Sequence, residues 1–311
     1  MKVTGIIAEY NPFHKGHAYH MQKARELTQA DYLLVVMSGD FTQRGTPALL
    51  DKYSRARMAL ACGADLVLEL PVRFACASAE FFAGGAVSLL HQLGVVDALC
   101  FGSECGNAGK LQKAAAALSK AEASEIYGNT LRQGLRSGLS FPAARARALG
   151  YGEDESGDLF ALPNNILGIE YCRALLGLQS AIRPVTILRK GAGYHDAQMQ
   201  GEKDRSCGFS SAFAIRHALQ EGGGFADIRG SLPEETREIW QSSLREGGTV
   251  SEKDFSPLLC YRLLMEAENG LSSYADVTTD LSDRLRKNLN RFTGWHEFCL
   301  LQNSKDMTYT R

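Results

Sequence analysis

The fold is decided by residues 3–17, which read Val3-Thr4-Gly5-Ile6-Ile7-Ala8-Glu9-Tyr10-Asn11-Pro12-Phe13-His14-Lys15-Gly16-His17. The first six of these residues form an apolar run typical of a buried strand, and a helical pattern follows from about residue 17 to residue 29. Ligands of a parallel sheet bind at the carboxyl ends of its strands, and a helix N-terminus offers free N–H groups to anions. The turn between the two elements is therefore predicted to bind phosphate.

The side chains of this turn suit that chemistry. Gly16 lets the backbone approach a ligand closely, and the imidazoles of His14 and His17 can both donate hydrogen bonds to a phosphate chain. The alternative is a pair of exposed histidines in a turn. The position of the motif directly after the first strand favours the phosphate site.

Four more apolar runs continue the pattern, at residues 32–37, 65–70, 97–101 and 185–188. Helical stretches at about 54–62 and 79–92 separate the earlier runs. Apolar strands that alternate with helices are typical of βαβ units and a parallel sheet. The predicted fold class is therefore α/β, with a Rossmann-like parallel sheet.

The rest of the chain is predicted to be helical, in two places. Residues 107–149 are rich in Ala, Lys, Glu and Arg and predict a helical insertion, which an acidic, Gly-rich loop extends to about residue 160. Asn164 and Asn165 are expected to cap the next helix. Gly222-Gly223-Gly224 indicates a boundary between a catalytic domain at 1–224 and a small helical domain at 225–311.

Composition excludes several classes of protein. The 311 residues include 34 basic and 35 acidic ones, so nucleic-acid binding would need a local basic patch. No apolar run is long enough to span a membrane and no signal peptide is visible, which predicts a cytoplasmic protein without a membrane partner. None of the eight cysteines forms a Cys-x-x-Cys pair, so we expect reduced thiols and no metal site in the protein.

A second phosphate motif is predicted late in the chain. Ser210 and Ser211 open a helix, and Arg216 follows about one turn on. Helix capping explains one of the two serines. It does not explain Arg216, whose guanidinium fork suits a phosphate group.

The two motifs together resemble the nucleotidyltransferase superfamily, whose members bind ATP and break its α–β phosphate bond. Further motifs resemble one family within it, the bacterial tRNA(Met) cytidine acetate ligases. They begin with Gly5 to His17 and continue with Met37-Ser38-Gly39-Asp40-Phe41-Thr42-Gln43-Arg44-Gly45, Ala64-Asp65-Leu66-Val67-Leu68-Glu69-Leu70-Pro71, Phe101-Gly102-Ser103-Glu104, Pro163-Asn164-Asn165-Ile166-Leu167-Gly168 and Gly193-Tyr194-His195-Asp196.

This resemblance implies a ligase that activates acetate with ATP to acetyl-adenylate. The acetyl group would then pass to N4 of the wobble cytidine of elongator tRNA(Met), forming N4-acetylcytidine. Of the Asn164-Asn165 pair, Asn165 is the preferred ATP ligand. The resemblance implies ATP binding by Ile7, Ala8, Glu9, Tyr10, Asn11, Pro12, Phe13, His14, Lys15, Gly16, His17, Ala18, Tyr19, His20, Gly102, Asn165 and Arg189.

The chemistry assigns roles to four of the candidate residues. His14 and His17 would hold the phosphates as they reorganise, and Ser211 and Arg216 would hold the β and γ phosphates. Mg²⁺ is expected to accompany ATP and to neutralise the triphosphate. Asp40 could face the same cleft, although an Asp in a turn explains it at least as well.

Two basic segments could contact RNA. Arg284, Lys287 and Arg291 are predicted to share one face of a helix, with Leu281, Leu285 and Leu289 docked on the core. A solvated amphipathic face is the alternative. The second candidates are the insertion residues Arg132, Arg136, Arg145 and Arg147.

Other residues keep two interpretations each. Arg44, Lys52 and Arg55 could reach phosphate or RNA, or could belong to a solvated helix face. Tyr194-His195-Asp196 could hold an acid–base pair or a structural hydrogen bond. Family members usually run past the motif Thr308-Tyr309-Thr310-Arg311, and whether such a C-terminal part carries tRNA contacts stays open.

Two other functions compete with the ligase. An adenylyltransferase acting on a small metabolite would use the same phosphate loops, but it would need neither the helical insertion nor the basic helix. A non-catalytic nucleotide- or RNA-binding module would not need the intact set of His14, His17, Ser211 and Arg216.

Overall fold

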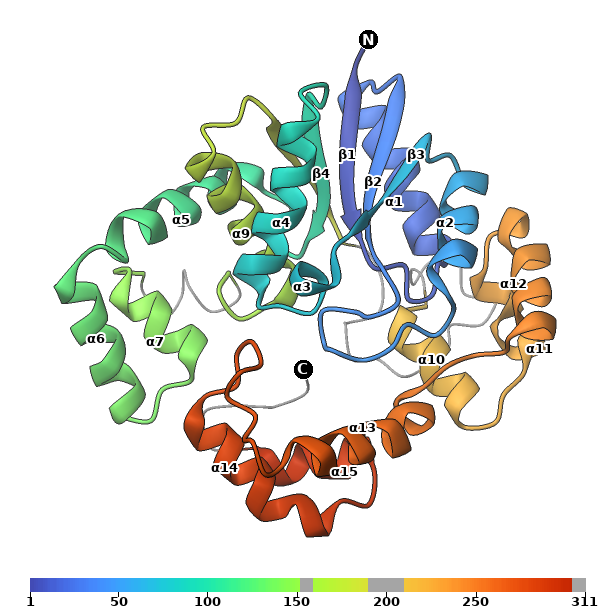
Figure 1. The fold of residues 1–311 in the computed structure, drawn as a ribbon. Helices are drawn as coiled ribbons and strands as arrows, with labels where there is room; N and C mark the ends of the chain where they lie inside the picture. Colours follow the sequence, from blue (N-terminus) through green and yellow to red (C-terminus); the bar gives the residue numbers. More distant parts are fainter. Residues whose placement is uncertain (152–158, 190–209, 304–311) are drawn as a thin grey trace.

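The computed structural model describes residues 1–151, 159–189 and 210–303 (Figure 1). Its strands are β1 (Val3–Ala8), β2 (Tyr32–Ser38), β3 (Leu66–Leu70), β4 (Ala98–Ser103) and β5 (Arg183–Leu188). They form one sheet with the order β3-β2-β1-β4-β5, and every neighbouring pair is parallel. The predicted α/β class is confirmed, and so are all five predicted strands, with ends that shift by at most two residues.

Strand β1 lies at the centre of the sheet, where the strand order reverses. Strands β2 and β3 continue the sheet on one side of it, and β4 and β5 on the other. Such a switch point is where an open parallel sheet binds its ligand. The loop that follows β1 is therefore the best-placed segment of the chain for a site.

Two aspartates align the starts of the central strands. The carboxylate of Asp97 accepts the N–H of Val3 at 2.7 Å, and that of Asp65 accepts the N–H of Leu33, also at 2.7 Å. Asp97 directly precedes β4, the sheet neighbour of β1, and Asp65 directly precedes β3, the sheet neighbour of β2. Each carboxylate therefore helps to fix the register of the neighbouring strand.

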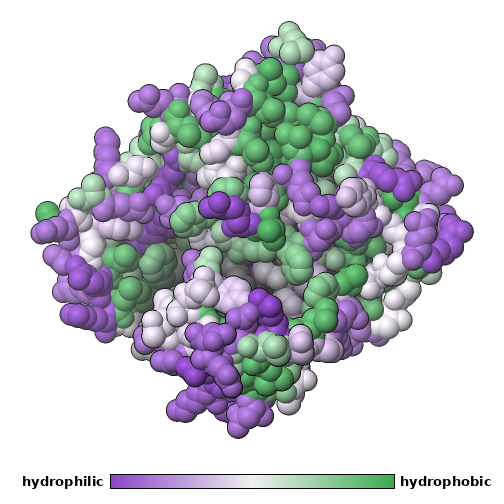
Figure 2. Space-filling view, viewed as in Figure 1, coloured by the Kyte–Doolittle hydropathy of each residue, from purple (hydrophilic) through white to green (hydrophobic). Residues whose placement is uncertain are grey.

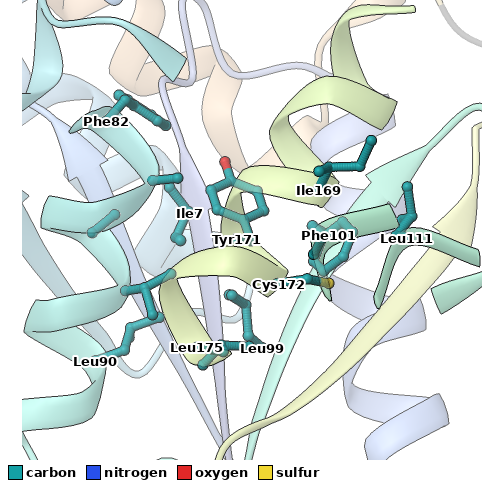
Figure 3. Close-up of a cluster of buried hydrophobic side chains, with 14 of the residues drawn as sticks. Ile7, Phe82, Leu90, Leu99, Phe101, Leu111, Ile169, Tyr171, Cys172 and Leu175 are labelled. Atoms are coloured by element: carbon teal, nitrogen blue, oxygen red, sulfur yellow. The ribbon is translucent and has the colours of Figure 1, made fainter. Parts of the chain in front are cut away.

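Helices cover both faces of the sheet. One face packs against α4 (Ala79–Gln92), α5 (Ala108–Ala121) and α9 (Pro163–Gly177), and the other against α1 (Lys15–Thr28), α2 (Lys52–Ala61) and α12 (Glu234–Glu246). The close packing of α4 on β1 requires glycine at position 5, because a Cβ there would lie 2.8 Å from Cδ1 of Leu90. The core on this face is labelled in Figure 3: Ile7, Phe82, Leu90, Leu99, Phe101, Leu111, Ile169, Tyr171, Cys172 and Leu175.

The predicted insertion is helical, as expected, but its parts differ in role. Helix α5 packs on α9 and is one layer of the core. Helices α6 (Glu125–Arg136) and α7 (Phe141–Ala148) pack on each other and form a hairpin at one side of the molecule (Figure 1). Within the insertion, this hairpin is the described part that extends beyond the sheet and its helical layers.

A buried ion-pair network ties the hairpin to the core. The carboxylate of Glu170 in α9, whose side chain is 4% exposed, lies 2.9 Å from Arg145 of α7 and 2.8 Å from Arg173. Arg173 also contacts Glu122, just after α5, at 2.5 Å. Because the charges are largely removed from water, each one depends on its partners.

The C-terminal part is helical, as predicted. It contains α11 (Phe225–Ile228), α12, α13 (Glu252–Glu266), α14 (Thr279–Asn288) and α15 (Trp295–Gln302), together with the 3-10 turns η1 (Arg229–Ser231) and η2 (Leu289–Arg291). Trp240 of α12 is fully buried in the same cluster as Met58 of α2. The domain boundary at 222–224 stays a prediction.

Other observations complete the comparison with the sequence. Neither Asn164 nor Asn165 caps a helix, because α9 starts at Pro163 with Leu162 in the cap position. Seven cysteines lie in the described ranges, all as free thiols. In those ranges no helix is long and apolar enough to cross a membrane. Phe209, the Tyr194-His195-Asp196 motif and Thr308 to Arg311 lie outside the described residues.

The buried network predicts a strong effect of one substitution. Replacing Glu170 with Ala leaves two guanidinium groups without their buried partner, so we expect a loss of about 3–5 kcal/mol in the free energy of unfolding. Urea denaturation measures it. The control is Glu26→Ala, which removes a solvent-exposed pair with Lys23 and should leave stability nearly unchanged. Equal stability losses in the two variants would contradict the role of Glu170 as the buried partner of both arginines.

Candidate active site

Two histidines hold the loop after β1 by hydrogen bonds from backbone N–H groups to their side chains. His14 is the N-cap of α1, and its Nδ1 accepts the N–H of Gly16 at 3.0 Å. Nδ1 of His17 in turn accepts the N–H of His14 at 3.3 Å. Since both Nδ1 atoms are acceptors, both rings carry their proton on Nε2. The centroids of the two rings lie 3.8 Å apart. The site therefore holds two adjacent imidazoles of the same tautomer, each with an Nε2–H donor.

The three histidines of this helix start are uncharged near neutral pH. Burial, together with the charges of Arg189 and Arg216, lowers the pKa of His14 to about 3. Burial likewise lowers the pKa of His20 to about 4 and holds the pKa of His17 well below its usual range. The imidazoles therefore offer hydrogen-bond donors rather than positive charge.

Positive charge comes from two arginines distant in the sequence. Arg216 of α10 (Ala212–Gln220) donates to the carbonyl oxygen of Asn11 at 2.5 Å, which brings the late motif to the early one as predicted. Arg189 follows β5 and influences all three histidines. The two guanidiniums and two neutral donors together suit a polyphosphate.

The two serines of the late motif have different positions. Ser211 is the N-cap of α10, and its Oγ accepts the N–H of Ala214 at 3.0 Å, so the capping interpretation is confirmed. Its hydroxyl group still carries a donor hydrogen. Ser210 is buried and accepts a hydrogen bond from Ser231 at 3.0 Å.

The two asparagines of the pair have different positions, and which of them binds ATP stays a prediction. Asn165 is fully buried and its Oδ1 accepts the N–H of Cys105 at 3.0 Å. Asn164 is half-buried, and its Oδ1 lies 3.4 Å from Nη1 of Arg189. Arg189 lies beside Gly102, where an added Cβ would be 3.2 Å from its Cγ. The geometry thus places Asn164 beside Arg189 and uses Asn165 to hold the loop after β4.

Glu104 has a role that sequence reasoning missed. Its carboxylate accepts the N–H of Asn164 at 3.2 Å and of Asn165 at 2.8 Å, and the Asn164 amide at 2.6 Å. It therefore caps α9 from another element and orients Asn164 toward Arg189. The Phe101-Gly102-Ser103-Glu104 motif contained this residue without indicating its partner.

Three residues of the predicted ATP-binding stretch line a cavity beside α1. Lys15 donates to the carbonyl oxygen of Gly230 at 2.5 Å. With Ala18 and Tyr19 it lines a cavity of about 390 Å³, which Gln22, Cys62 and Glu235 complete.

The basic residues near β2 are structural. Lys52 pairs with Glu69 at 2.8 Å, and its N–H is accepted by Asp40 at 2.9 Å, so Asp40 is a turn and cap residue. Arg55 is fully buried, so both of its interpretations, as a ligand of RNA or phosphate and as a solvated residue, are wrong.

The helix face predicted for the first RNA candidate is not continuous in the structure, and RNA binding there stays a prediction. Helix α14 ends at Asn288, so Arg291 lies on η2 and does not continue the predicted helix face. Arg284 donates to the carbonyl oxygen of Gln302 at 2.6 Å and joins α14 to α15. Lys287 and Arg291 are exposed.

The second RNA candidate keeps three of its four residues. Arg145 is engaged by Glu170, whereas Arg132, Arg136 and Arg147 are exposed on the α6–α7 hairpin. The strands point toward α13–α15 (Figure 1), and the surface is hollowed between the hairpin and these helices (Figure 2). Both basic segments border the side of the molecule to which the strands lead.

The low histidine pKa values predict a pH effect. Unfolding restores the ordinary pKa of about 6.5, so below pH 6.5 the unfolded state binds protons that the folded state excludes, and stability falls as the pH is lowered toward 3. His14→Asn keeps an N-capping side chain but removes one such group. We expect stability near the wild-type value at pH 7.5 and roughly 1–2 kcal/mol less loss at pH 5, by urea denaturation. An unchanged pH dependence would contradict the burial of a neutral His14.

Known proteins resemble this chain over its whole length. The family model for HIGH Nucleotidyl Transferase matches residues 1–311. The chain is 39% identical over 324 residues to a tRNA(Met) cytidine acetate ligase of Alkaliphilus metalliredigens, covering 100% of the chain and 74% of that relative. A Clostridium novyi protein of the same name is 40% identical over 314 residues, with coverages of 100% and 76%.

Solved structures give the same result. Thermotoga maritima TmcAL in its apo form matches with a TM-score of 0.88 and 38% identity, over 100% of this chain and 73% of that one. TmcAL bound with alpha-thio ATP matches with a TM-score of 0.84 and 38% identity, over 100% and 72%. The chain therefore belongs to the tRNA(Met) cytidine acetate ligase family of the HIGH-type nucleotidyltransferases.

Proposed function

We propose that this protein uses ATP and acetate to acetylate N4 of the wobble cytidine of elongator tRNA(Met). One observation carries the proposal: two neutral Nε2–H donors and the Arg216 guanidinium meet at the switch point of the sheet. Relatives about 40% identical over the whole chain bear the name of this reaction, and one neighbour binds an ATP analogue.

The reaction has two steps. In the first, an acetate oxygen attacks the α-phosphorus of ATP, the α–β bridging bond breaks, and pyrophosphate leaves with its electron pair. In the second, the cytidine amine attacks the acetyl carbon, loses a proton, and AMP leaves. Phosphoryl transfer of this kind is catalysed by positioning and by stabilising charge, with little covalent chemistry from the protein.

The donors of the site match the first step. Nε2–H groups of His14 and His17 can bond the phosphate oxygens, whose negative charge grows as the α–β bond breaks. Arg216 and Ser211 would bind the β and γ phosphates, and Arg189, with Asn164 beside it, lies on the β4–β5 side. The remaining residues of the loop position these donors.

Mg²⁺ fits this site only as a companion of ATP. The described ranges contain no group of three or more His, Cys, Asp or Glu side chains that could hold a metal ion. We propose that phosphate oxygens hold the ion, which would neutralise part of the triphosphate charge.

The RNA surface of the proposal is formed by two exposed basic segments. Lys287 and Arg291 lie at and beyond the end of α14, and Arg132, Arg136 and Arg147 lie on the α6–α7 hairpin. A cytidine must leave its stack to reach an acyl-adenylate, so an anticodon loop is the part of tRNA that suits the site.

The first step can be tested by ATP–pyrophosphate exchange. Wild-type protein should exchange pyrophosphate only when acetate is present, and His17→Ala should lower the rate by roughly 10²–10³-fold through loss of one transition-state donor. Gln22→Ala, an exposed change on the same helix, is the control and should keep the wild-type rate. Exchange that requires a phosphorylated metabolite instead of acetate would replace the ligase by an adenylyltransferase.

The second step separates the two basic segments. Lys287→Ala with Arg291→Ala, and Arg132→Ala with Arg136→Ala and Arg147→Ala, should leave exchange intact but weaken tRNA binding. Each lost phosphate contact should also flatten the salt dependence of log K by about one unit. Binding is measured by filter retention at several salt concentrations. The control is Lys2→Ala, because Lys2 lies before the start of β1, at the end of the sheet opposite to the proposed site. Unchanged salt slopes in both multiple variants would exclude these segments.

A further inference from the structure

Arg55 of α2 forms four hydrogen bonds, all to backbone carbonyl oxygens, although its side chain is fully buried. Nε donates to Leu50 at 3.0 Å, and Nη1 donates to Glu9 at 2.6 Å and to Ser38 at 3.1 Å. Nη2 donates to Gly39. One guanidinium therefore joins three separate segments of the chain.

No carboxylate offsets this charge at close range. Within the described ranges, the ion pairs do not include Arg55, and Asp40, Glu9, Asp51 and Glu69 act on it only at longer distance. Burial lowers the pKa of Arg55, yet an arginine remains protonated in proteins. A buried positive charge held only by carbonyl dipoles is costly, and an apolar side chain of similar size would often be as stable.

The positions of the acceptors explain the charge. Glu9 directly follows β1, Ser38 ends β2 and Gly39 follows it, so their carbonyl groups lie at the carboxyl edge of the sheet beside the His14–His17 loop. Carbonyl oxygens there would repel a polyphosphate. Arg55 takes them as acceptors and turns their negative ends inward.

The same bonds orient the peptide planes. In a planar trans peptide the C=O and N–H groups point in opposite directions. The N–H groups of Tyr10, Gly39 and Asp40 therefore point away from the guanidinium. Arg216 holds the carbonyl of Asn11, two residues further along the loop, so two arginines fix the backbone before His14.

We propose that Arg55 is a positioning residue for polyphosphate binding, which acts by holding the backbone carbonyl groups of residues 9, 38 and 39. The proposal rests on the proposed function in one respect, the assignment of the loop to the phosphates of ATP. It gives Arg55 no contact with substrate. Its effect should appear in the binding of phosphates and not in the binding of the nucleoside.

The test compares two buried substitutions on the same helix. Arg55→Lys keeps the charge but cannot span four carbonyl groups, whereas Met58→Ala opens a cavity in the core and leaves the loop contacts in place. Melting temperatures of both variants are measured first. Affinities for ATP and for adenosine are then measured by isothermal titration calorimetry, which requires no acetate and no turnover.

We expect Arg55→Lys to weaken ATP binding about tenfold or more and to change adenosine binding less than twofold. Met58→Ala should leave both affinities within twofold at a comparable loss of melting temperature. A wild-type ATP affinity in Arg55→Lys would overturn the proposal, and so would equal losses of ATP and adenosine binding. If wild type fails to exchange pyrophosphate with acetate while this ATP-specific loss is observed, the proposed function fails and the role of Arg55 stands.

Discussion

The structure depends on how backbone groups are satisfied where β1 gives way to α1. The end of a parallel strand leaves carbonyl oxygens without partners, and the start of a helix leaves N–H groups without partners. Both kinds of group occur here within a few residues. His14 and His17 accept N–H groups through Nδ1, while Arg55 and Arg216 donate to the carbonyls of Glu9 and Asn11. The loop keeps one conformation, and the Nε2–H groups remain for a ligand.

The sheet was predictable because local pattern and global fold agree in it. The five strands are short runs of apolar residues, and an alternating order of strand and helix allows few topologies. The helical insertion was predicted only as a unit. Helix α5 belongs to the core because its buried residues, which include Leu111 and Leu118, lie on the side that packs on α9. A pattern along the chain does not show which distant helix will cover an apolar stripe.

The site was predictable where residues lie in a motif and unpredictable where charges find distant partners. The meeting of Arg216 with the early loop follows from the two phosphate motifs. Arg55, Arg145 and Arg284 look alike in the sequence as basic residues on helices, but the structure engages them with carbonyls, a carboxylate and a carbonyl respectively. The different positions of Asn164 and Asn165 were unpredictable for the same reason, because Glu104 and Cys105, which they contact, are sixty positions away.

The division of labour among the site's donors follows from the two-step chemistry. A site built only from cations would bind ATP tightly but would hold pyrophosphate equally tightly, and such uniform binding does not accelerate a reaction. Under the proposed function, the neutral imidazoles add directional bonds that strengthen as charge develops on the leaving phosphates. The guanidiniums of Arg189 and Arg216 help to keep the imidazoles neutral, because their charges lower the pKa of His14. The proposed site thus combines two kinds of group. The arginines attract ATP, and the uncharged histidine donors avoid adding positive charge that would slow the release of pyrophosphate.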